Sequence, residues 1–229
     1  MAVKLVIKIG GHLISTSSGL NLDLLKAYAE IISRTFNQGK WCIVIGGGEE
    51  ARKYISAARS LGLNEALCDS LAVSVTRIHA KIFSTLIGDK AYQNIPETLE
   101  QIVEYTSFGK IVVAGGLQPA QSTTAVAALA AEAIGAERLL IATDVEGVYT
   151  ADPKRNPNAK LLREATLSKV EEILRESSHT AGEYKLLDQL AIKVLKRSRI
   201  PAVVLNGKKP ENLEKAIAGE KIGTLITPE

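Results

Sequence analysis

The chain has 229 residues, of which 46% are hydrophobic and 23% are charged, and its formal net charge is +3. This composition is that of a globular protein and excludes a disordered chain, and the length suits one α/β domain with its own core. No apolar run approaches the roughly 18 residues that a membrane helix needs, and so small a charge does not predict nucleic-acid binding, so we expect neither a membrane nor a nucleic-acid partner.

Short apolar, β-rich runs alternate along the chain with helical patterns. This alternation predicts a three-layer α/β sandwich, with a mostly parallel central sheet covered by helices. The expected strands are almost continuously apolar, as strands buried on both faces should be. In chain order they cover residues 3–9, 42–45, 111–114, 139–142, 202–205 and 224–226.

The helices expected between these strands show apolar residues at spacings of three and four, capping residues at their starts and glycine after their ends. The first two cover residues 22–36 and 51–61. The third is capped by Asn64 and runs toward Gly88, the fourth is opened by Pro96, and the fifth is capped by Ser122 and ends before Gly135. The last three cover residues 167–175, 186–198 and 211–218. The longest expected loop covers residues 143–158, and loops of that length are often functional.

Three of the expected strands run directly into glycines, at positions 10–11, 46–48 and 115–116. Ligands of open α/β sheets collect at the carboxyl ends of strands, where glycine lets backbone N–H groups approach an anion. We therefore predict an anion or nucleotide site at this edge. The patterns GxxxxGK[ST] and GxGxxG are absent, and no Cys/His cluster has metal-ligand spacing, so any metal should be Mg²⁺ carried by substrate phosphates.

Four stretches of the sequence carry a specific resemblance. Residues 8–11, KIGG, resemble the opening of the amino acid kinase superfamily, and residues 143–153, TDVEGVYTADP, resemble its nucleotide-binding signature. Residues 115–128, GGLQPAQSTTAVAA, and 181–191, AGEYKLLDQLA, narrow the resemblance to the UMP kinases of archaeal type. The resemblance covers essentially the whole chain, in order, and its Gly-Gly-x-Gln-Pro-x-Gln-Ser-Thr stretch is the most discriminating part.

The resemblance implies an enzyme that reversibly transfers the γ-phosphoryl group of ATP to UMP, giving UDP and ADP, in pyrimidine nucleotide (CTP) biosynthesis. It implies one domain over residues 1–229, in which residues 1–137 hold UMP and residues 138–229 hold ATP. It also implies Mg²⁺ bound through the ATP phosphates, a homohexamer, and inhibition by UTP.

The site residues implied by the resemblance fall into three groups. The catalytic residues are Lys8, Arg52 and Asp188. The ATP-binding residues are Lys8, Gly10, Gly11, Gly48, Arg52, Thr143, Asp144, Tyr149 and Asp152. The UMP-binding residues are Gly47, Asp69, Leu117, Gln118, Pro119, Ala120, Gln121, Ser122 and Thr123. These residue types suit the chemistry, because phosphoryl transfer needs positioning and charge neutralisation, a carboxylate accepts from ribose hydroxyls, and amides match a uracil edge.

The chain departs from the superfamily pattern at three positions. Many members carry an aspartate that organises the catalytic lysines where this chain has Ala125, and either Asp188 or Mg²⁺ is expected to take over that task. His12 stands where relatives often have Lys or Ser, and its side chain either lies beside the phosphate loop or turns outward. Lys185 falls near the place of a second catalytic lysine.

Plainer interpretations remain open. Lys8 could be an edge-strand charge, and Asp188 could pair with Lys185 or Arg197 on a helix surface. His79 and His179 are expected to be ordinary surface residues. Cys42 and Cys68 form no CxxC pair, and the N-terminus lacks the pattern of a signal peptide, so both cysteines are predicted to be reduced core residues of a cytoplasmic protein.

Two other functions remain as alternatives. One is a superfamily kinase for acetylglutamate, isopentenyl phosphate or carbamate, and the other is a non-catalytic nucleotide- or oxyanion-binding protein on the same fold. The first needs no ribose or uracil partners, so Asp69, Gln118 and Gln121 argue against it. The joint presence of Lys8, Arg52 and Asp152 argues for catalysis over mere binding.

Overall fold

The computed structural model describes residues 2–153, 156–178 and 186–228. Eight strands in these residues form one sheet in the order β5-β6-β4-β1-β7-β9-β10-β8. They are β1 (Leu5–Ile9), β4 (Trp41–Ile45), β5 (Ala91–Tyr92), β6 (Ile111–Ala114), β7 (Arg138–Thr143), β8 (Glu164–Thr166), β9 (Ala202–Asn206) and β10 (Thr224–Thr227). Every neighbouring pair is parallel except β9 and β10, so the predicted mostly parallel sheet is confirmed.

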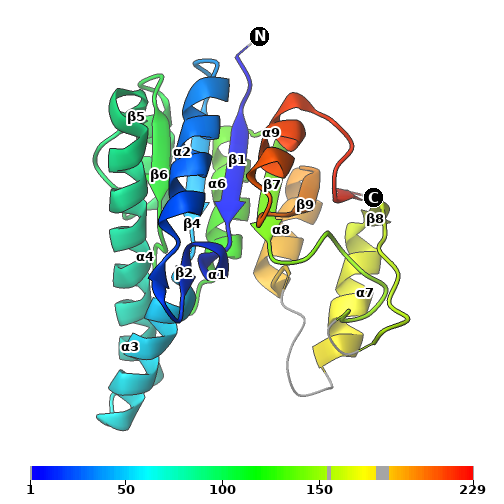
Figure 1. The fold of residues 1–229 in the computed structure, drawn as a ribbon, viewed down its shortest axis with the longest axis horizontal. Helices are drawn as coiled ribbons and strands as arrows, with labels where there is room; N and C mark the ends of the chain where they lie inside the picture. Colours follow the sequence, from blue (N-terminus) through cyan, green and yellow to red (C-terminus); the bar gives the residue numbers. More distant parts are fainter. Residues whose placement is uncertain (1, 154–155, 179–185, 229) are drawn as a thin grey trace.

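Helices cover both faces of this sheet, as Figure 1 shows, and the predicted three-layer sandwich is confirmed. One layer contains α2 (Leu22–Thr35), α4 (Glu65–Ile87) and α9 (Pro210–Ala218). The other contains α5 (Leu99–Thr106), α6 (Thr123–Ile134), α7 (Leu167–Ser178) and α8 (Gln189–Ser198). The remaining elements are the helix α3 (Gly48–Ser60) and four short ones, which are α1 (Gly11–Ile14), β2 (Ser15–Thr16), β3 (Gly19–Leu20) and the 3₁₀ turn η1 (Gly88–Lys90).

The central strand β1 separates the two layers of the core. Leu5, Ile7 and Ile9 pack in the layer of α2, α4 and α9, whereas Val6 packs in the layer of α6 and α8. Because successive side chains of a strand point to opposite faces, Lys8 shares the face of Val6. β1 pairs with β4 on one side and β7 on the other, so the edge-strand interpretation of Lys8 is wrong.

Side-chain caps set several helix starts. Asn64 and Ser122 accept backbone hydrogen bonds at the starts of α4 and α6, as predicted. The helix expected to open at Pro96 begins at Leu99 instead, because Thr98 caps it. The helix expected from residue 186 begins at Gln189, because Asp188 is its cap.

Other predicted boundaries also differ from those in the structure. α3 begins three residues earlier than expected, since the turn after β4 is only two glycines long. β2, β3, β5, β8 and α1 were not predicted, because two to four residues are too few to show a period. Cys42 and Cys68 are buried and unpaired, as expected. Within the described residues, no helix combines the length and the apolar character needed to cross a membrane.

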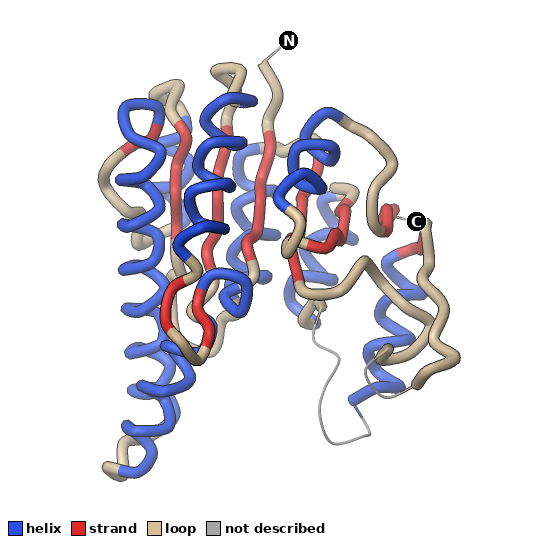
Figure 2. The backbone as a smooth tube through the Cα atoms, in the orientation of Figure 1, coloured by secondary structure: helices blue, strands red, loops and turns tan. Residues whose placement is uncertain are grey.

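The parallel strands point their carboxyl ends toward one edge of the molecule, where Figure 2 shows α1, the β2–β3 hairpin and the start of α3. α2 is fastened to this edge by one buried hydrogen bond, in which the Tyr28 hydroxyl donates to the Gly207 carbonyl oxygen at 2.7 Å. Burial raises the pKa of Tyr28, so its hydroxyl stays a donor.

Replacing Tyr28 with Phe should lower the free energy of unfolding by about 1–3 kcal/mol, because it leaves the Gly207 carbonyl buried without a donor. Urea unfolding followed by circular dichroism measures the change. Tyr54→Phe is the matched control, since Tyr54 is 56% exposed. Equal unfolding free energies for the two variants would contradict a stabilising role of this hydrogen bond.

Candidate active site

The glycine turns after β1, β4 and β6 lie side by side, because these three strands are neighbours in the sheet. The turns after β1 and β4 are in van der Waals contact. A Cβ atom added to Gly11 would lie 2.1 Å from the backbone nitrogen of Gly48, and Gly48 has a φ of +61°. Glycine fits such a close approach, and it adopts such a backbone angle more readily than any other residue. The three turns predicted to share an edge therefore do so.

A cavity of about 480 Å³ opens beside these turns. It is lined by Gly47, Gly48, Ala51, Asp69, Ala72, Val73, Thr76, Gly116, Gln118, Ala120, Gln121, Ser122 and Thr123. The lining thus joins most of the residues predicted to bind UMP, from α3, from α4 and from the loop after β6. Leu117 and Pro119 belong to the same loop but not to the described lining of the cavity.

The loop after β6 is held against α4 by Asp69. Its Oδ2 accepts a 2.8 Å hydrogen bond from the backbone N–H of Ala120, which has a left-handed backbone with a φ of +59°. Residues other than glycine rarely adopt this angle, and such strain is often found at functional sites. The nearby Gln121 Oε1 atom is buried without a hydrogen-bond partner in the described structure. A ligand N–H group in the cavity could satisfy it.

Lys8 lies half-buried at the end of β1, and burial lowers its pKa to about 8. The charges of Asp188 and Asp144 act in the opposite direction and favour the ammonium form. Among the described residues, Lys8 has no hydrogen-bond partner that would fix its amine in place. A partly desolvated cation at the carboxyl edge is suited to meet a phosphate.

Asp188, whose charge acts on Lys8, is bonded to the start of α6. It caps α8 by accepting from the backbone N–H of Ala191 at 2.8 Å, and its other oxygen accepts from the hydroxyl of Ser122. Ser122 in turn accepts the backbone N–H of Ala125 at 3.0 Å. The carboxylate is therefore next to the turn that carries Ala125, and Arg197 pairs with Glu132 instead of with Asp188.

The loop after β7 carries the residues predicted to bind adenosine. Thr143 ends β7 and is buried, and the Oδ1 of the next residue, Asp144, lies 3.5 Å from Nε2 of His12. His12 therefore turns toward the site, which excludes the outward orientation. Tyr149 forms an isolated β-bridge with Leu161. Asp152, Tyr149 and Asp144 all have further interactions within the chain.

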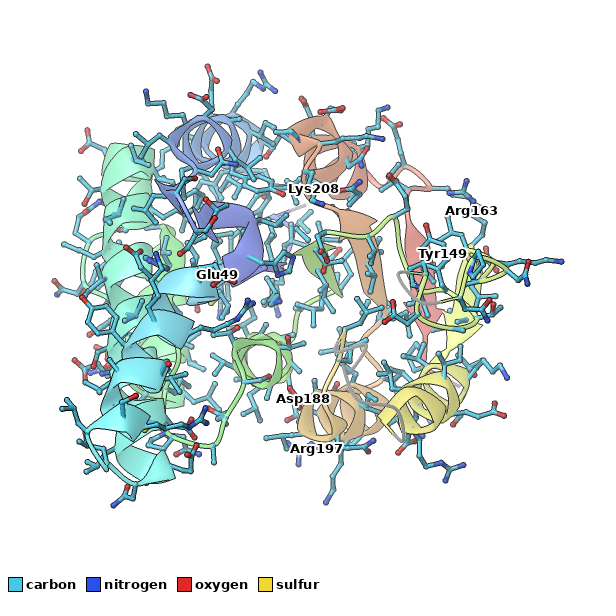
Figure 3. The ribbon with its side chains drawn as sticks, turned by 60° about the horizontal axis from the view of Figure 1, so that its bottom comes forward. Glu49, Tyr149, Arg163, Asp188, Arg197 and Lys208 are labelled. Carbon is cyan, nitrogen blue, oxygen red and sulfur yellow. The ribbon has the colours of Figure 1, made fainter. Side chains whose placement is uncertain are left out.

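Figure 3 looks onto this edge, with Glu49 to the left, Asp188 below and Tyr149 to the right. Arg52 is placed differently from the prediction. Its guanidinium bonds to Glu49 on α3, and its side chain is 61% exposed and outside the described lining of the cavity. Lys185 and His179 fall outside the described residues.

Three residues of α4 that the sequence did not assign to the site hold the glycine turns. Thr76 Oγ1 accepts from the N–H of Gly116 at 2.6 Å, and Arg77 donates to the carbonyl oxygens of Gly116 and Leu117 at 3.1 and 3.0 Å. His79 was expected at the surface, but it is 3% exposed, because it lies on the side of α4 that faces β4.

A simple signal could have found part of this set. Asp69 and Thr76 are seven residues apart, so they share a helix face.

A larger cavity, of about 910 Å³, lies at the opposite end of β7. Its charged lining residues are balanced in sign, and they are Glu137, Arg138, Arg163, Glu164, Glu220 and Lys221. It does not adjoin the glycine turns.

Comparisons with known proteins agree with this geometry. The sequence pattern of the amino acid kinase family matches residues 3–206. The uridylate kinase of Methanobrevibacter smithii is 40% identical over 98% of this chain and 99% of that protein, and that of Metallosphaera sedula is 44% identical over 99% and 100%. The crystal structure of uridylate kinase from Archaeoglobus fulgidus matches with a TM-score of 0.88 at 36% identity, over 98% of this chain and 100% of that one. The chain therefore belongs to the amino acid kinase family, alongside the archaeal uridylate kinases.

Proposed function

We propose that this protein is a UMP kinase, which transfers the γ-phosphoryl group of ATP to UMP. The observation that carries the proposal is the cavity that combines Gly47 and Gly48, at the start of α3, with Asp69 and Gln121. Glycine N–H groups suit a phosphate, a carboxylate suits ribose hydroxyls, and the unsatisfied amide oxygen suits a uracil N–H. The uridylate kinase relatives support the same assignment.

In the proposed reaction, a phosphate oxygen of UMP attacks the γ-phosphorus of ATP. A new P–O bond forms as the bond from the γ-phosphorus to the bridging β–γ oxygen breaks, which leaves UDP and ADP. The attacking oxygen is already ionised, so no general base is needed. The protein supplies positioning and positive charge, which are the main demands of phosphoryl transfer.

Lys8 is the proposed source of charge at the transferred group, and Asp188 orients its amine from the start of α8. Gly10 and Gly11 would contact the ATP phosphates, Gly47 would contact the phosphate of UMP, and Gly48 would lie where the two phosphate chains meet. Arg52 would exchange Glu49 for a phosphate oxygen when the nucleotides bind. This exchange is sterically open, because the Arg52 side chain lies mostly in solvent.

Phosphoryl transfer from ATP generally requires a divalent cation, and we propose Mg²⁺. Within the described residues, no group of three or more His, Cys, Asp or Glu is arranged to hold a metal ion. Asp144 and Asp188, the carboxylates whose charges act on Lys8, would lie near a cation carried by the phosphates. When bound, the cation would neutralise charge between the two phosphate chains.

We also propose that residues 1–137 bind UMP and residues 138–229 bind ATP within one domain, in the cytoplasm, as a step of pyrimidine nucleotide synthesis. A homohexamer inhibited by UTP is part of the proposal. Self-association is supported by exposed apolar residues along α4, which are Leu67, Leu71, Ile78, Ile82 and Leu86. A monomer in sedimentation velocity, or unchanged activity with added UTP, would contradict the respective statement.

A coupled ADP-release assay tests the function directly. We expect rapid ADP release with ATP, Mg²⁺ and UMP, slower release with CMP, and only background release with isopentenyl phosphate or acetylglutamate. Faster turnover of either of those two substrates would replace the proposal with another kinase activity. No release with any acceptor, together with nucleotide binding in calorimetry, would favour the non-catalytic protein.

Replacing Lys8 with Ala should lower kcat for UMP phosphorylation by about 10²-fold or more, with a smaller effect on KM for UMP, because the charge is needed most in the transition state. Steady-state kinetics measures both constants. Lys26→Ala, at an exposed position on α2, is the control and should retain activity. A kcat within threefold of the unmodified protein would remove Lys8 from the mechanism.

Replacing Asp69 with Asn should weaken UMP binding by about five- to tenfold, since hydrogen bonds to charged groups contribute more than those between neutral ones. ATP binding should stay nearly unchanged. Isothermal calorimetry with each nucleotide measures the two affinities, and Asp89→Asn, exposed at the far end of α4, is the matched control. A loss confined to ATP would reverse the proposed division of the two sites.

A further inference from the structure

His79 connects α4 to the turn after β4 through both of its ring nitrogens. Nδ1 lies 3.1 Å from the carbonyl oxygen of Gly46, and Nε2 lies 3.1 Å from Oε2 of Glu50. The ring is 3% exposed, whereas the Glu50 side chain is 39% exposed. These two partners flank Gly47 and Gly48, the glycines that line the cavity.

The chemistry of the two partners determines the protons on this pair. A carbonyl oxygen only accepts hydrogen bonds, so Nδ1 must carry a proton to bond to Gly46. An ionised carboxylate also only accepts, so Nε2 needs a second proton, or Glu50 must carry one. A hydrogen bond between Nε2 and Glu50 requires one proton between the two groups, and the pair then has no net charge.

This neutrality matters because Glu50 lies in the first turn of α3, which follows the phosphate-binding glycines directly. A second acid in that turn, Glu49, is bonded to Arg52. An unpaired carboxylate there would repel a bound phosphate, and like charges that lie close together disfavour one another. The backbone N–H of Glu50 donates to Ser15 Oγ at 3.1 Å, so the turn is held from the β2 side as well.

The opposite side of the turn is also restrained. The N–H of Gly46 donates to the carbonyl oxygen of Ile9 at 3.1 Å, which fastens the turn to β1. His79 supplies the corresponding hydrogen bond to the carbonyl oxygen of Gly46 from α4. The peptide groups before the two phosphate-binding glycines are therefore held between the central strand and a buried imidazole.

We propose that His79 is a positioning residue for the acceptor phosphate. It fixes the carbonyl of Gly46 and with it the N–H of Gly47, which belongs to the same peptide group, and it neutralises Glu50 beside the bound phosphate. This inference rests on the proposed function, which assigns that cavity to UMP. His79 acts through the turn and does not itself contact the substrate.

Two conservative substitutions separate the two contacts of the ring. The amide nitrogen of Asn can take the place of Nδ1, and that of Gln can take the place of Nε2. His79→Ala should raise KM for UMP by about tenfold or more, as expected for a displaced binding group, and should change KM for ATP less than twofold. His79→Asn should recover most of the loss by restoring the bond to Gly46.

The control variant is Thr85→Ala, an exposed position on the same helix, which should leave both KM values unchanged. Thermal unfolding of each variant shows whether α4 remains folded. Equal losses for UMP and ATP in His79→Ala, or no recovery in His79→Asn, would overturn the positioning role.

A second measurement requires no substrate, so it tests the hydrogen bond between His79 and Glu50 even if the protein phosphorylates another acceptor. Nitrogen-15 spectra of the histidine rings distinguish a ring protonated on both nitrogens from either neutral tautomer. We expect a His79 ring that either carries both protons or changes its signals in Glu50→Gln. A neutral ring whose signals are the same in that variant would refute the shared proton. If the unmodified protein fails to phosphorylate UMP, the proposed function falls while this spectroscopic result stands.

Discussion

The site depends on one lysine ammonium held in the middle of the sheet. β1 is flanked on both sides by parallel strands, and Lys8 lies one residue before its carboxyl end. Burial disfavours the charge and lowers the pKa to about 8, while Asp188 and Asp144 partly restore it. Two negatively charged phosphate chains would further stabilise the ammonium form of Lys8. In the proposed mechanism, the cost of burying the cation would be recovered when the substrates bind, which is the condition for an electrostatic catalyst.

The glycine turns at this edge of the sheet are held by hydrogen bonds from α4. α4 acts as the scaffold, since its buried face bonds to the turn after β4 through His79 and to the turn after β6 through Thr76 and Arg77. Asp69, farther along the same helix, holds the left-handed Ala120. A single rigid helix thus keeps two loops, far apart in the sequence, in register on either side of one cavity.

Much of this arrangement was predictable because its signals are local. Apolar strands that run into glycine, and caps such as Asn64 and Ser122, depend on a few neighbouring residues, and both caps were correct. The capping role of Thr98 was not predicted, because proline is common in the first turn of a helix and Pro96 therefore predicted an earlier start. The roles of Arg77 and His79 could not be predicted, since their partners lie 39 and 33 residues away. Only the folded sheet brings those partners to α4.

The placement of Arg52 shows a different limit. Its sequence position suggests a phosphate contact, yet its guanidinium bonds to Glu49 three residues earlier. An exposed ion pair of this kind contributes little to stability, so a phosphate could displace it readily. The family resemblance thus predicts the role of Arg52, whereas a local ion pair on α3 determines where its side chain lies in the structure.

The most direct test of this account is the titration of the Lys8 amine, followed by nuclear magnetic resonance of protein with isotope-labelled lysine and assigned with Lys8→Arg. We predict that the Lys8 amine of the free protein titrates near pH 8, because burial disfavours its charged form. Adding UMP with a non-hydrolysable ATP analogue should raise the pKa, since adjacent phosphates favour the ammonium form. A Lys8 amine that titrates near its ordinary value of 10.5 in the free protein, and does not respond to the nucleotides, would contradict the account.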